Sequence, residues 1–376
     1  MTSHTKNRTM SIFILFSALP LACHSDYQIM ARKPDIDPAD VTNCDFEPIS
    51  STRMSRFLCN PVFTQTDEAW NNGVSSIGFH VTEVLGHPFF QIWYTSRTVD
   101  SYGVGYAVSD NGMEWTVHPS NPIMTSTEGE WDQDALEGQI VTWDSKREAY
   151  IMAYQGVTLG VDDFDDGTWG LGIATSTDGV LWNKQPQNPV IDFINDFTLE
   201  FNQRPCWPLT LKITDTGYTG YIASSTIGSG NACNIYSLSS NDLIQWELNS
   251  ETPILTAGFS YDRLGFADAA VVEWQNTETD EKTLYMFYVG YADLINQGNH
   301  AVVADTSVGL ATSTDNGQSW EKRAMPFPIQ QTEIGQITSI GAKIIGSRIH
   351  LWIGDTYNNN GAIGYFYYEP DIEPHE

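Results

Sequence analysis

The chain is poor in basic residues. Its 376 residues contain 18 Lys and Arg against 47 Asp and Glu, which gives a net charge of −29. Binding to a nucleic-acid backbone needs clustered Lys and Arg, so we expect no nucleic-acid partner. An acidic surface favours solubility and resists self-association, and salt screens its self-repulsion. We therefore expect a soluble monomer whose charge reflects its habitat rather than a partner.

Several motifs are absent as well. There is no Cys-x-x-Cys or His–Cys pairing of the kind that binds zinc. There is no Gly-x-Ser-x-Gly and no Walker loop, which excludes the usual serine-triad and nucleotide sites. The chain has no amphipathic helical stretch and no linker that would divide it. It does have 41% hydrophobic residues, 30 Gly and 17 Pro, a composition typical of many short strands joined by turns.

The N-terminus has the pattern of a secretion signal. Lys6 and Arg8 precede an apolar run at 11–22. At about 12 residues this run is too short to span a bilayer. The run ends in Leu-Pro-Leu-Ala before Cys23, which resembles a bacterial lipoprotein box except for Pro20. We expect a signal peptide at 1–22, a tether and N-terminal extension at 23–59, and export to the periplasm, the outer membrane or the medium of a bacterium, with a lipid on Cys23 as the sole membrane attachment.

Four further cysteines remain: Cys44, Cys59, Cys206 and Cys233. An even number of cysteines in an exported protein suggests disulfides. We expect Cys44–Cys59 and Cys206–Cys233, because these pairs close short local loops. Three connectivities are open, and four buried thiols are the alternative.

A Trp-centred turn recurs along the chain. In each copy a strand ends at Ser or Thr, an Asp or Asn follows to bond its own backbone, and Gly usually takes the position with positive φ. The Trp residues lie 67, 64 and 74 positions apart, and self-similarity at such a period indicates a repeat architecture. The four copies are Gly105–Trp115, Gly172–Trp182, Tyr236–Trp246 and Gly309–Trp320.

An earlier strand of the unit occurs five times. The five copies are Phe90–Thr95, Tyr150–Tyr154, Tyr218–Ala223, Leu284–Val289 and Ile349–Gly354. The fifth repeat ends with a strand at 361–368, and segment 60–63 copies the Asn-Pro start of its missing last strand. We predict an all-β, five-bladed β-propeller over 60–370, with a tail at 371–376, in which the N-terminal strand completes the C-terminal blade and no sheet edge stays open. A β-sandwich is the alternative, but it does not explain the period.

These units resemble the five-bladed glycoside hydrolase superfamily: the arabinanases and xylosidases of family 43, the invertases of family 32 and the mannoside phosphorylases. The shared features are the Gly-x-Ala-x-Ser-x-Asp-Gly-x-x-Trp turn with Asn-Pro after it, and a Tyr-rich second strand. The turn Ser313–Trp320 also matches the Asp-box of six-bladed sialidases, but five repeats favour the first group. The Asp-box aspartate is structural there, and we expect the same of Asp110, Asp178 and Asp315.

The resemblance places chemistry where the innermost strands begin and the second strands end. Glu137 and Asp268 align at the first of these places, each followed by a small residue. Two carboxyl groups usually cut a glycosidic bond, and the acid has a raised pKa. We expect Glu137 and Asp268 to be the acid and the base, with Asp355 as a third acid and Asp134 and Asp262 as weaker candidates for sugar contact. The alternative is that each carboxylate caps a turn by binding backbone amides.

The chain departs from the family 43 pattern of Asp, Asp and Glu on three blades. The first blade offers Ser75 and Ser76 at this level, and the third offers Arg204. Either the catalytic set is rearranged, or the scaffold binds sugar without cutting it.

Three scarce arginines, Arg97, Arg204 and Arg263, are expected on the same face. Our hypothesis is an anion site for a uronate or sulfate group, which Arg binds bidentately. The alternative is that each pairs with a nearby carboxylate.

Three tryptophans at this level are placed to stack on sugar rings, with a role in the core as the alternative; they are Trp70, Trp131 and Trp207. The acidic run at 162–167 lacks the alternating ligand spacing of a calcium loop, so we expect a solvated turn there. The sequence predicts no cofactor, and a structural calcium ion stays an open alternative.

Two functions of different class follow. The first is an exported glycoside hydrolase acting on an oligo- or polysaccharide, anionic if the arginines bind it. The second is a non-catalytic carbohydrate-binding or surface protein on a degenerate hydrolase scaffold. A sialidase-like enzyme comes third, because it needs a Tyr nucleophile and an Arg triad that the sequence does not supply.

Overall fold

The structure is a computed structural model that describes residues 44–50, 52–64, 75–84, 87–97, 102–160, 163–193, 205–224, 232–276, 279–297, 300–329, 336–355 and 361–370. The chain divides into Met1–Ala31 and Arg32–Glu376, and only the second unit contains described residues. The expected signal peptide and Cys23 therefore lie outside the described residues. Within the ranges above there is no helix, and hence none able to cross a membrane.

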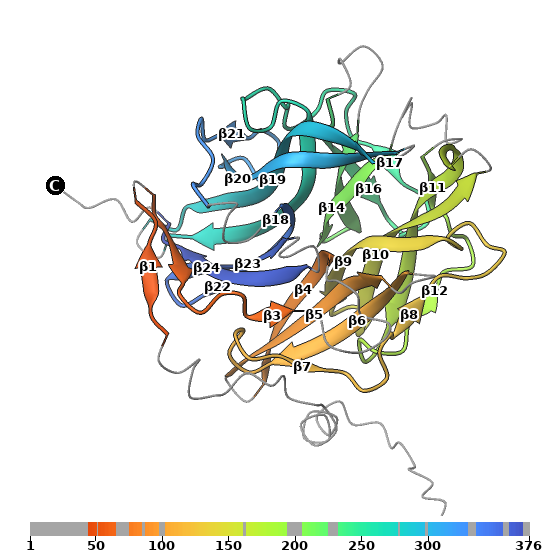
Figure 1. Cartoon of the computed structure of the whole chain (residues 1–376), viewed down its shortest axis with the longest axis horizontal. Coiled ribbons are helices and arrows are strands. Elements are labelled where there is room, and N and C mark those ends of the chain that lie inside the picture. The colour runs from red at the N-terminus through yellow and green to blue at the C-terminus, as the bar shows by residue number, and fades with distance from the viewer. Residues whose placement is uncertain are drawn as a thin grey trace, which may run out of the picture. The chain divides into compact units, whose positions relative to one another are not determined.

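Five antiparallel sheets form the five blades of a β-propeller, as the sequence predicts (Figure 1). Blade 1 contains β4 (Ser75–Val84), β5 (His87–Arg97), β6 (Tyr102–Ser109), β7 (Thr116–Val117) and β8 (Met124–Thr125). Blade 2 contains β9 (Ala135–Asp144), β10 (Ala149–Gly160), β11 (Asp163–Ser176), β12 (Asn183–Lys184) and β13 (Ile191–Asp192). Blade 3 contains β14 (Pro205–Ile213), β15 (Tyr218–Ser224), β16 (Asn234–Ser240) and β17 (Glu247–Leu248).

Blades 4 and 5 close the ring. Blade 4 contains β18 (Gly265–Gln275), β19 (Lys282–Gln297), β20 (His300–Ser313) and β21 (Glu321–Lys322). Blade 5 contains β22 (Ile337–Ile345), β23 (Arg348–Asp355), β24 (Ala362–Tyr368), β2 (Met54–Phe57), β1 (Phe46–Pro48) and β3 (Phe63–Thr64). The innermost strands contact one another in the order β4, β9, β14, β18, β22, and β22 returns to β4, so they surround a central axis.

The N-terminal segment completes the C-terminal blade, as predicted. β2 lies beside β24, with Met54 opposite Tyr368, and β3 pairs with the other end of β24, with Phe63 opposite Ile363. The exchange starts earlier than Asn60, because β1 and β2 also belong to the blade. β1 and β2, which lie in the stretch that the sequence assigns to an extension, are therefore strands of the propeller.

The Asn of each Asn-Pro pair anchors the chain to the third strand of its own blade. Asn60 Nδ2 donates to the carbonyl oxygen of Tyr365 at 3.1 Å, and Asn60 Oδ1 accepts from the amide of Tyr365 at 2.6 Å. Asn121 makes the same two bonds to Tyr106 at 3.1 and 2.9 Å. The repeated side-chain geometry explains why this dipeptide marks the outer strands in the sequence.

The Asp of the Trp-centred turn organises backbone amides. Asp178 Oδ1 accepts from the amides of Val180 and Leu181, each at 2.8 Å. In blade 1 the same two bonds go to Asn111 and not to Asp110. The structural role predicted for Asp110 therefore belongs to its neighbour, because the turn serine lies two residues before Asn111.

Each of these turns packs against the second strand of the preceding blade. The indole nitrogen of Trp93 in blade 1 donates to the carbonyl oxygen of Gly179 in blade 2 at 2.7 Å. In blade 4, a Cβ on Gly317 would lie 2.4 Å from the Tyr221 hydroxyl of blade 3. The turn thus fills the space between neighbouring blades; in blades 2 and 4 only glycine fits there, whereas blade 3 places the buried Leu243 at this position.

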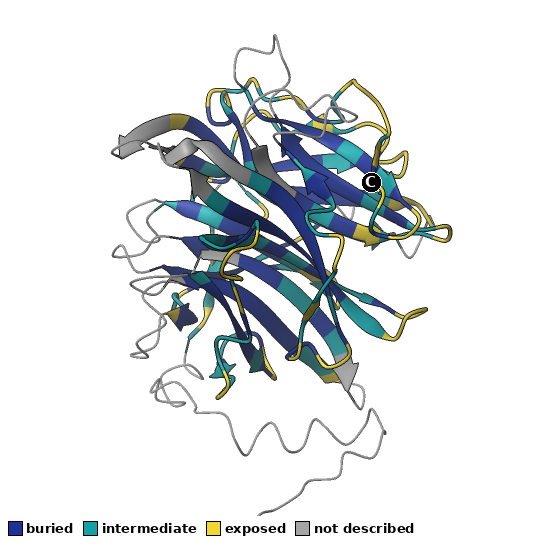
Figure 2. Ribbon diagram, turned by 90° about the vertical axis from the view of Figure 1, so that its right-hand side faces the viewer, coloured by how far each residue is buried: buried dark blue, intermediate teal, exposed yellow. Residues whose placement is uncertain are grey.

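Buried residues lie along the strands, and exposed residues gather in the turns (Figure 2). The Cys44–Cys59 disulfide is confirmed, and Cys233 is disulfide-bonded as well. The side chain of Cys206, its expected partner, lies outside the described residues.

Candidate functional site

The start of each innermost strand lies beside the end of the second strand, at one edge of the blade. Ala135 is opposite Val157, Gly265 is opposite Tyr291, and Ile337 is opposite Asp355. The pairing register shifts within the first few residues of every innermost strand. Such bulges re-aim side chains and are common beside functional sites. The edge where the sequence places the chemistry is therefore irregular in all five blades.

Glu137 and Asp268 occupy equivalent positions in blades 2 and 4. Glu137 is opposite Gln155, and Asp268 is opposite Val289. Both partners lie five residues after the residue that pairs with the turn serine. That residue is Tyr150, opposite Ser176, in blade 2 and Leu284, opposite Ser313, in blade 4. The register thus reproduces the alignment made from the sequence.

Glu137 is half-buried and stands opposite the buried Gln155. Burial raises the pKa of its carboxyl group, and no opposing cause accompanies it. Loss of hydration disfavours the charged form of a carboxyl group, so this side chain holds its proton to a higher pH than an exposed glutamate.

Asp268 is held by the backbone. Its Oδ1 accepts from the amide of Ala269 at 2.8 Å, and its Oδ2 accepts from the amide of Ile340 in blade 5 at 2.9 Å. Burial nevertheless raises its pKa to about 8, because desolvation outweighs these two hydrogen bonds. Asp268 therefore binds backbone amides, as the alternative to a catalytic role expects. Its raised pKa also means that the carboxyl group keeps its proton at neutral pH.

The innermost strands enclose a cavity of about 390 Å³ on the axis. Asp268 lines it together with residues of all five blades, among them Ile77, Ile140, Leu209 and Ile340. Its volume falls within the range of small-ligand pockets. Asp268 therefore stands between an axial cavity and the neighbouring blade.

Gln155 is a residue that the sequence analysis missed. Its side chain is 0% exposed, and within the described part of the chain neither polar atom of the carboxamide has a hydrogen-bond partner. A buried unpaired amide costs about 1–3 kcal/mol, and such groups call for an explanation. The equivalent positions hold Thr95, Ala223, Val289 and Gly354. Thr95, the other polar residue at that place, donates to Gln139 at 2.7 Å, so only the lack of a partner distinguishes Gln155, and the sequence does not show it.

Two blade 5 residues share this edge. Ser339 stands opposite Gly354, is 1% exposed, and its Oγ has no hydrogen-bond partner among the described residues. Asp355, the expected third acid, ends β23 and is also 1% exposed. It stays a candidate by position.

Asp262 and Asp134 differ in setting. Asp262 is 0% exposed; its Oδ2 accepts from Lys322 Nζ at 2.8 Å and its Oδ1 from the amide of Phe259 at 2.8 Å. These bonds support a structural role rather than sugar contact. Asp134 is half-buried and accepts from Gln133 Nε2 at 3.3 Å.

Of the three arginines expected to form an anion site, the structure describes the side chain of Arg263 alone. Arg263 and Asp293 form an exposed ion pair with 3.8 Å between Nη2 and Oδ1. This pairing is the expected alternative to an anion site. The side chain of Arg97 and all of Arg204 lie outside the described residues.

Trp131 packs inside blade 2. A Cβ on Gly156 would lie 2.3 Å from its ring, and the ring centroid is 5.8 Å from that of Tyr154. Both contacts support the core role that was the alternative to sugar stacking. Trp70 and the side chain of Trp207 lie outside the described residues. The turn expected at 162–167 is wrong, because β11 already begins at Asp163, opposite Gly160; the side chains of 163–167 lie outside the described residues. The described residues contain no group of three or more His, Cys, Asp or Glu able to hold a metal ion.

Known structures share the fold. A glycosyl hydrolase from Bacteroides ovatus matches with a TM-score of 0.58 and 15% identity over 89% of this chain and 96% of its own. A β-1,2-mannobiose phosphorylase from Listeria innocua, in complex with β-1,2-mannobiose, matches with a TM-score of 0.56 and 14% identity over 84% and 96%. A family 32 β-fructofuranosidase from Bombyx mori matches with a TM-score of 0.54 and 13% identity over 81% of this chain, which spans only 60% of the enzyme.

No family model and no curated protein matches the sequence. At these identities the likeness establishes the five-bladed fold of glycoside hydrolases and mannoside phosphorylases, and a fold alone does not fix a reaction.

Proposed function

We propose that this protein is an exported glycan-active enzyme that cleaves glycosidic bonds with Glu137 and Asp268. The observation that carries the proposal is the register: two carboxyl groups with raised pKa values stand at one position on the innermost strands of blades 2 and 4. Perturbed carboxyl groups are a recurrent property of acid–base sites, and Asp268 also lines the axial cavity.

The two groups take different roles. Asp268, with a pKa of about 8, holds a proton at neutral pH and donates it to the leaving glycosidic oxygen. Glu137 then acts as base or nucleophile at the anomeric carbon. Gln155, directly opposite Glu137, is positioned to orient that carboxylate or to bind a sugar hydroxyl.

The test is a screen of the purified protein on oligosaccharides, with and without inorganic phosphate, beside Glu137→Gln and Asp268→Asn. We expect each substitution to lower kcat/KM by at least about a hundredfold, the usual range for a lost acid or base. Glu251→Gln, at an exposed position outside the strands, is the matched control and should keep full activity. Equal activity in the wild type and all three variants would exclude Glu137 and Asp268 as the catalytic pair.

A specific observation favours a second candidate. Both oxygens of Asp268 accept backbone amides, as in a purely structural cap. On this basis the protein would bind a glycan without cleaving it. Retention of an oligosaccharide by the wild type and by both variants, with no product from any of them, would support this candidate over the enzyme.

Export and lipidation also belong to the proposal. The Cys44–Cys59 disulfide supports an oxidising compartment, where such bonds persist. Cell fractionation of the full chain and of Cys23→Ser tests both points. A membrane-bound wild type and a released variant are expected, whereas identical distributions would exclude the lipid anchor.

A further inference from the structure

Blades 2 and 4 each contain a lysine–aspartate pair at the same place. Lys184 Nζ donates to Asp132 Oδ2 at 2.6 Å, and Lys322 Nζ donates to Asp262 Oδ2 at 2.8 Å. Both aspartates are buried. A buried ion pair offsets its desolvation only when further hydrogen bonds satisfy both groups, so the other contacts of each pair show what it holds in place.

In blade 2 the pair fixes the loop that leads into the innermost strand β9. Lys184 Nζ also donates to the carbonyl oxygen of Thr125 at 2.9 Å and to Thr127 Oγ1 at 2.7 Å. Asp132 Oδ1 accepts from the amide of Thr127 at 3.3 Å, and Tyr154 Oη donates to Asp132 Oδ2 at 3.4 Å. The loop is thereby tied to the outer strand β12 and to the second strand β10 of its own blade.

Blade 4 repeats these contacts on the loop that leads into β18. Lys322 Nζ donates to the carbonyl oxygen of Thr256 at 2.7 Å. Asp262 Oδ1 accepts from the amide of Phe259 at 2.8 Å, and Tyr288 Oη donates to Asp262 Oδ2 at 3.1 Å. We call the pairs Lys184–Asp132 and Lys322–Asp262 the entry clamps, because each holds the loop through which the chain enters its blade.

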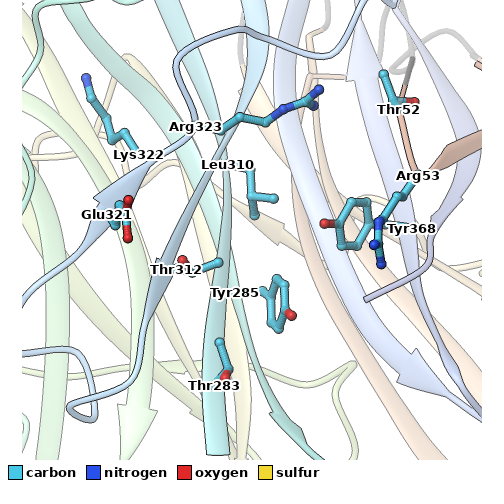
Figure 3. Close-up of a pocket in the computed structure, with 10 residues that line it drawn as sticks. All are labelled: Thr52, Arg53, Thr283, Tyr285, Leu310, Thr312, Glu321, Lys322, Arg323 and Tyr368. Carbon is cyan, nitrogen blue, oxygen red and sulfur yellow. The ribbon is translucent and has the colours of Figure 1, made fainter. Parts of the chain in front are cut away.

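The lysine of each clamp stands opposite the residue two before the turn serine. The residue pairs at this register in blades 1 to 4 are Val117 with Ala107, Lys184 with Ala174, Leu248 with Leu238 and Lys322 with Ala311. Blades 1 and 3 thus have an apolar residue there, and blade 5 has Arg56, which pairs with Glu47 at 2.6 Å. Lys322 extends away from its chain neighbour Arg323, as Figure 3 shows, so its ammonium group serves the loop.

The aspartate of each clamp packs on a glycine of the second strand. A Cβ on Gly156 would lie 2.7 Å from the Cβ of Asp132, and one on Gly290 would lie 2.7 Å from that of Asp262. Each glycine directly follows the residue that stands opposite the proposed catalytic carboxyl group of its blade. The other three blades have a side chain at this position: Ser96, Ser224 and Asp355.

We infer that the entry clamps are positioning residues for Glu137 and Asp268. Asp132 lies five residues before Glu137, and Asp262 lies six residues before Asp268. Each clamp therefore fixes both the chain that leads into the innermost strand and the second strand beside it. A misplacement of about 1 Å can cost about a hundredfold in rate, so a catalytic carboxyl group needs such support. The contribution to catalysis rests on the proposed function, whereas the placement of the two side chains does not.

The experiment removes one clamp at a time without changing the net charge. The double variants are Lys184→Met with Asp132→Asn and Lys322→Met with Asp262→Asn. Because neither leaves a buried charge unpaired, both should fold. On the oligosaccharide that the wild type cleaves, we expect kcat to fall at least about tenfold in each, with KM within about threefold, because a displaced carboxyl group affects the chemical step more than binding.

Tyr218→Phe is the matched control for a loss of stability alone. It removes a buried hydrogen bond to Asp144 Oδ2 at 2.5 Å, at the end of β9 that is far from Glu137 in the strand. This variant should lower the urea midpoint and leave kcat unchanged.

A second measurement does not depend on turnover. The pKa of Asp268, about 8, is set by burial and by two backbone amides. Carbon NMR of carboxyl-labelled protein follows it, with Asp268→Asn to assign the signal. Loss of the blade 4 clamp should lower this pKa by at least about one unit, because the released strand end admits water to the carboxyl group. Tyr218→Phe should not move it.

The outcomes separate the clamps from the cleavage. If the wild type cleaves no oligosaccharide, the proposed function fails, and the pKa of Asp268 decides whether the clamp positions this side chain. An unchanged pKa of Asp268, an unchanged kcat in both double variants of an active enzyme, or an equal loss of kcat in Tyr218→Phe would overturn the inference.

Discussion

The indole nitrogen of Trp352 donates a hydrogen bond to the carbonyl oxygen of Gly112, 2.7 Å away. The two residues belong to the last and the first blade, 240 positions apart in the chain. Trp93 and Gly179 repeat the contact one blade on, at the same distance. The ring is therefore closed twice, by strand exchange in blade 5 and by this turn.

The first prediction concerns the fit of these turns. Gly179 has φ of +77°, and a Cβ there would lie 2.9 Å from the Trp93 ring. Gly129 has φ of +78° with nothing within 4 Å. Gly129→Ala should cost about 1–2 kcal/mol of unfolding free energy for backbone strain alone. Gly179→Ala should cost about 1–3 kcal/mol more because it displaces the indole. Urea unfolding checks both, and equal costs would mean that the turn does not press on Trp93.

A second prediction follows from Asp268. As general acid with a pKa of about 8, it must keep its proton, so kcat/KM should fall as the pH rises through 8. Glu137 must lose its proton, which sets the acidic limb above the ordinary glutamate range. A rate that stays constant from pH 7 to 10 would contradict the assignment of Asp268 as the acid.

The same pKa has a consequence for stability. The native state keeps the Asp268 proton that the unfolded chain releases near pH 4, so this group lowers the free energy of unfolding progressively between about pH 4 and pH 8. Asp268→Asn should remove that slope, although it costs about 1–3 kcal/mol at low pH because one backbone amide loses its acceptor. Urea midpoints across this window measure the effect, and parallel curves for both proteins would refute it.

Gln155 gives a prediction with opposite signs for stability and activity. Gln155→Met replaces a buried, unpaired amide by an apolar chain of similar size and should raise the unfolding free energy by about 1 kcal/mol while lowering kcat/KM. Gln91→Met is the control: Gln91 is also buried but binds Tyr106 and Tyr150 at 2.8 and 3.1 Å, so its replacement should destabilise. A Gln155 variant that is stabilised with full activity would rule out a role at the site.

The buried pair Lys322–Asp262 should be sensitive to loss of one partner. Lys322→Met leaves Asp262, 0% exposed, without its counter-charge and should cost about 3–5 kcal/mol. Lys282→Met removes an exposed pair with Glu273 and should cost at most about 1 kcal/mol. Thermal unfolding compares the two, and similar shifts would mean that the buried pair contributes no more than the exposed one.

Repetition made the fold accessible from the sequence. The Trp-centred turns and the Asn-Pro dipeptides use local side-chain-to-backbone bonds, such as those of Asp178, which leave a fixed spacing in the chain. The inner-strand alignment of Glu137 with Asp268 also followed from spacing, since the register of a strand pair is set by the turn that joins it. The prediction placed the turn residue of blade 1 at Asp110, one residue too early, because Asn111 accepts the two backbone amides.

Other features were decided by contacts between distant segments. Asp262 and Trp131 resembled site residues by position, but burial against Lys322 and Gly156 assigns them to the scaffold. The unpaired state of Gln155 depends on the neighbouring strands, which bring no hydrogen-bond partner to its carboxamide among the described residues. The sequence by itself determined the five blades and the level of the two carboxyl groups, because both are encoded in local turns and their spacing. Only the tertiary structure decided which charges are neutralised, because desolvation and ion pairing depend on neighbours brought together by the ring.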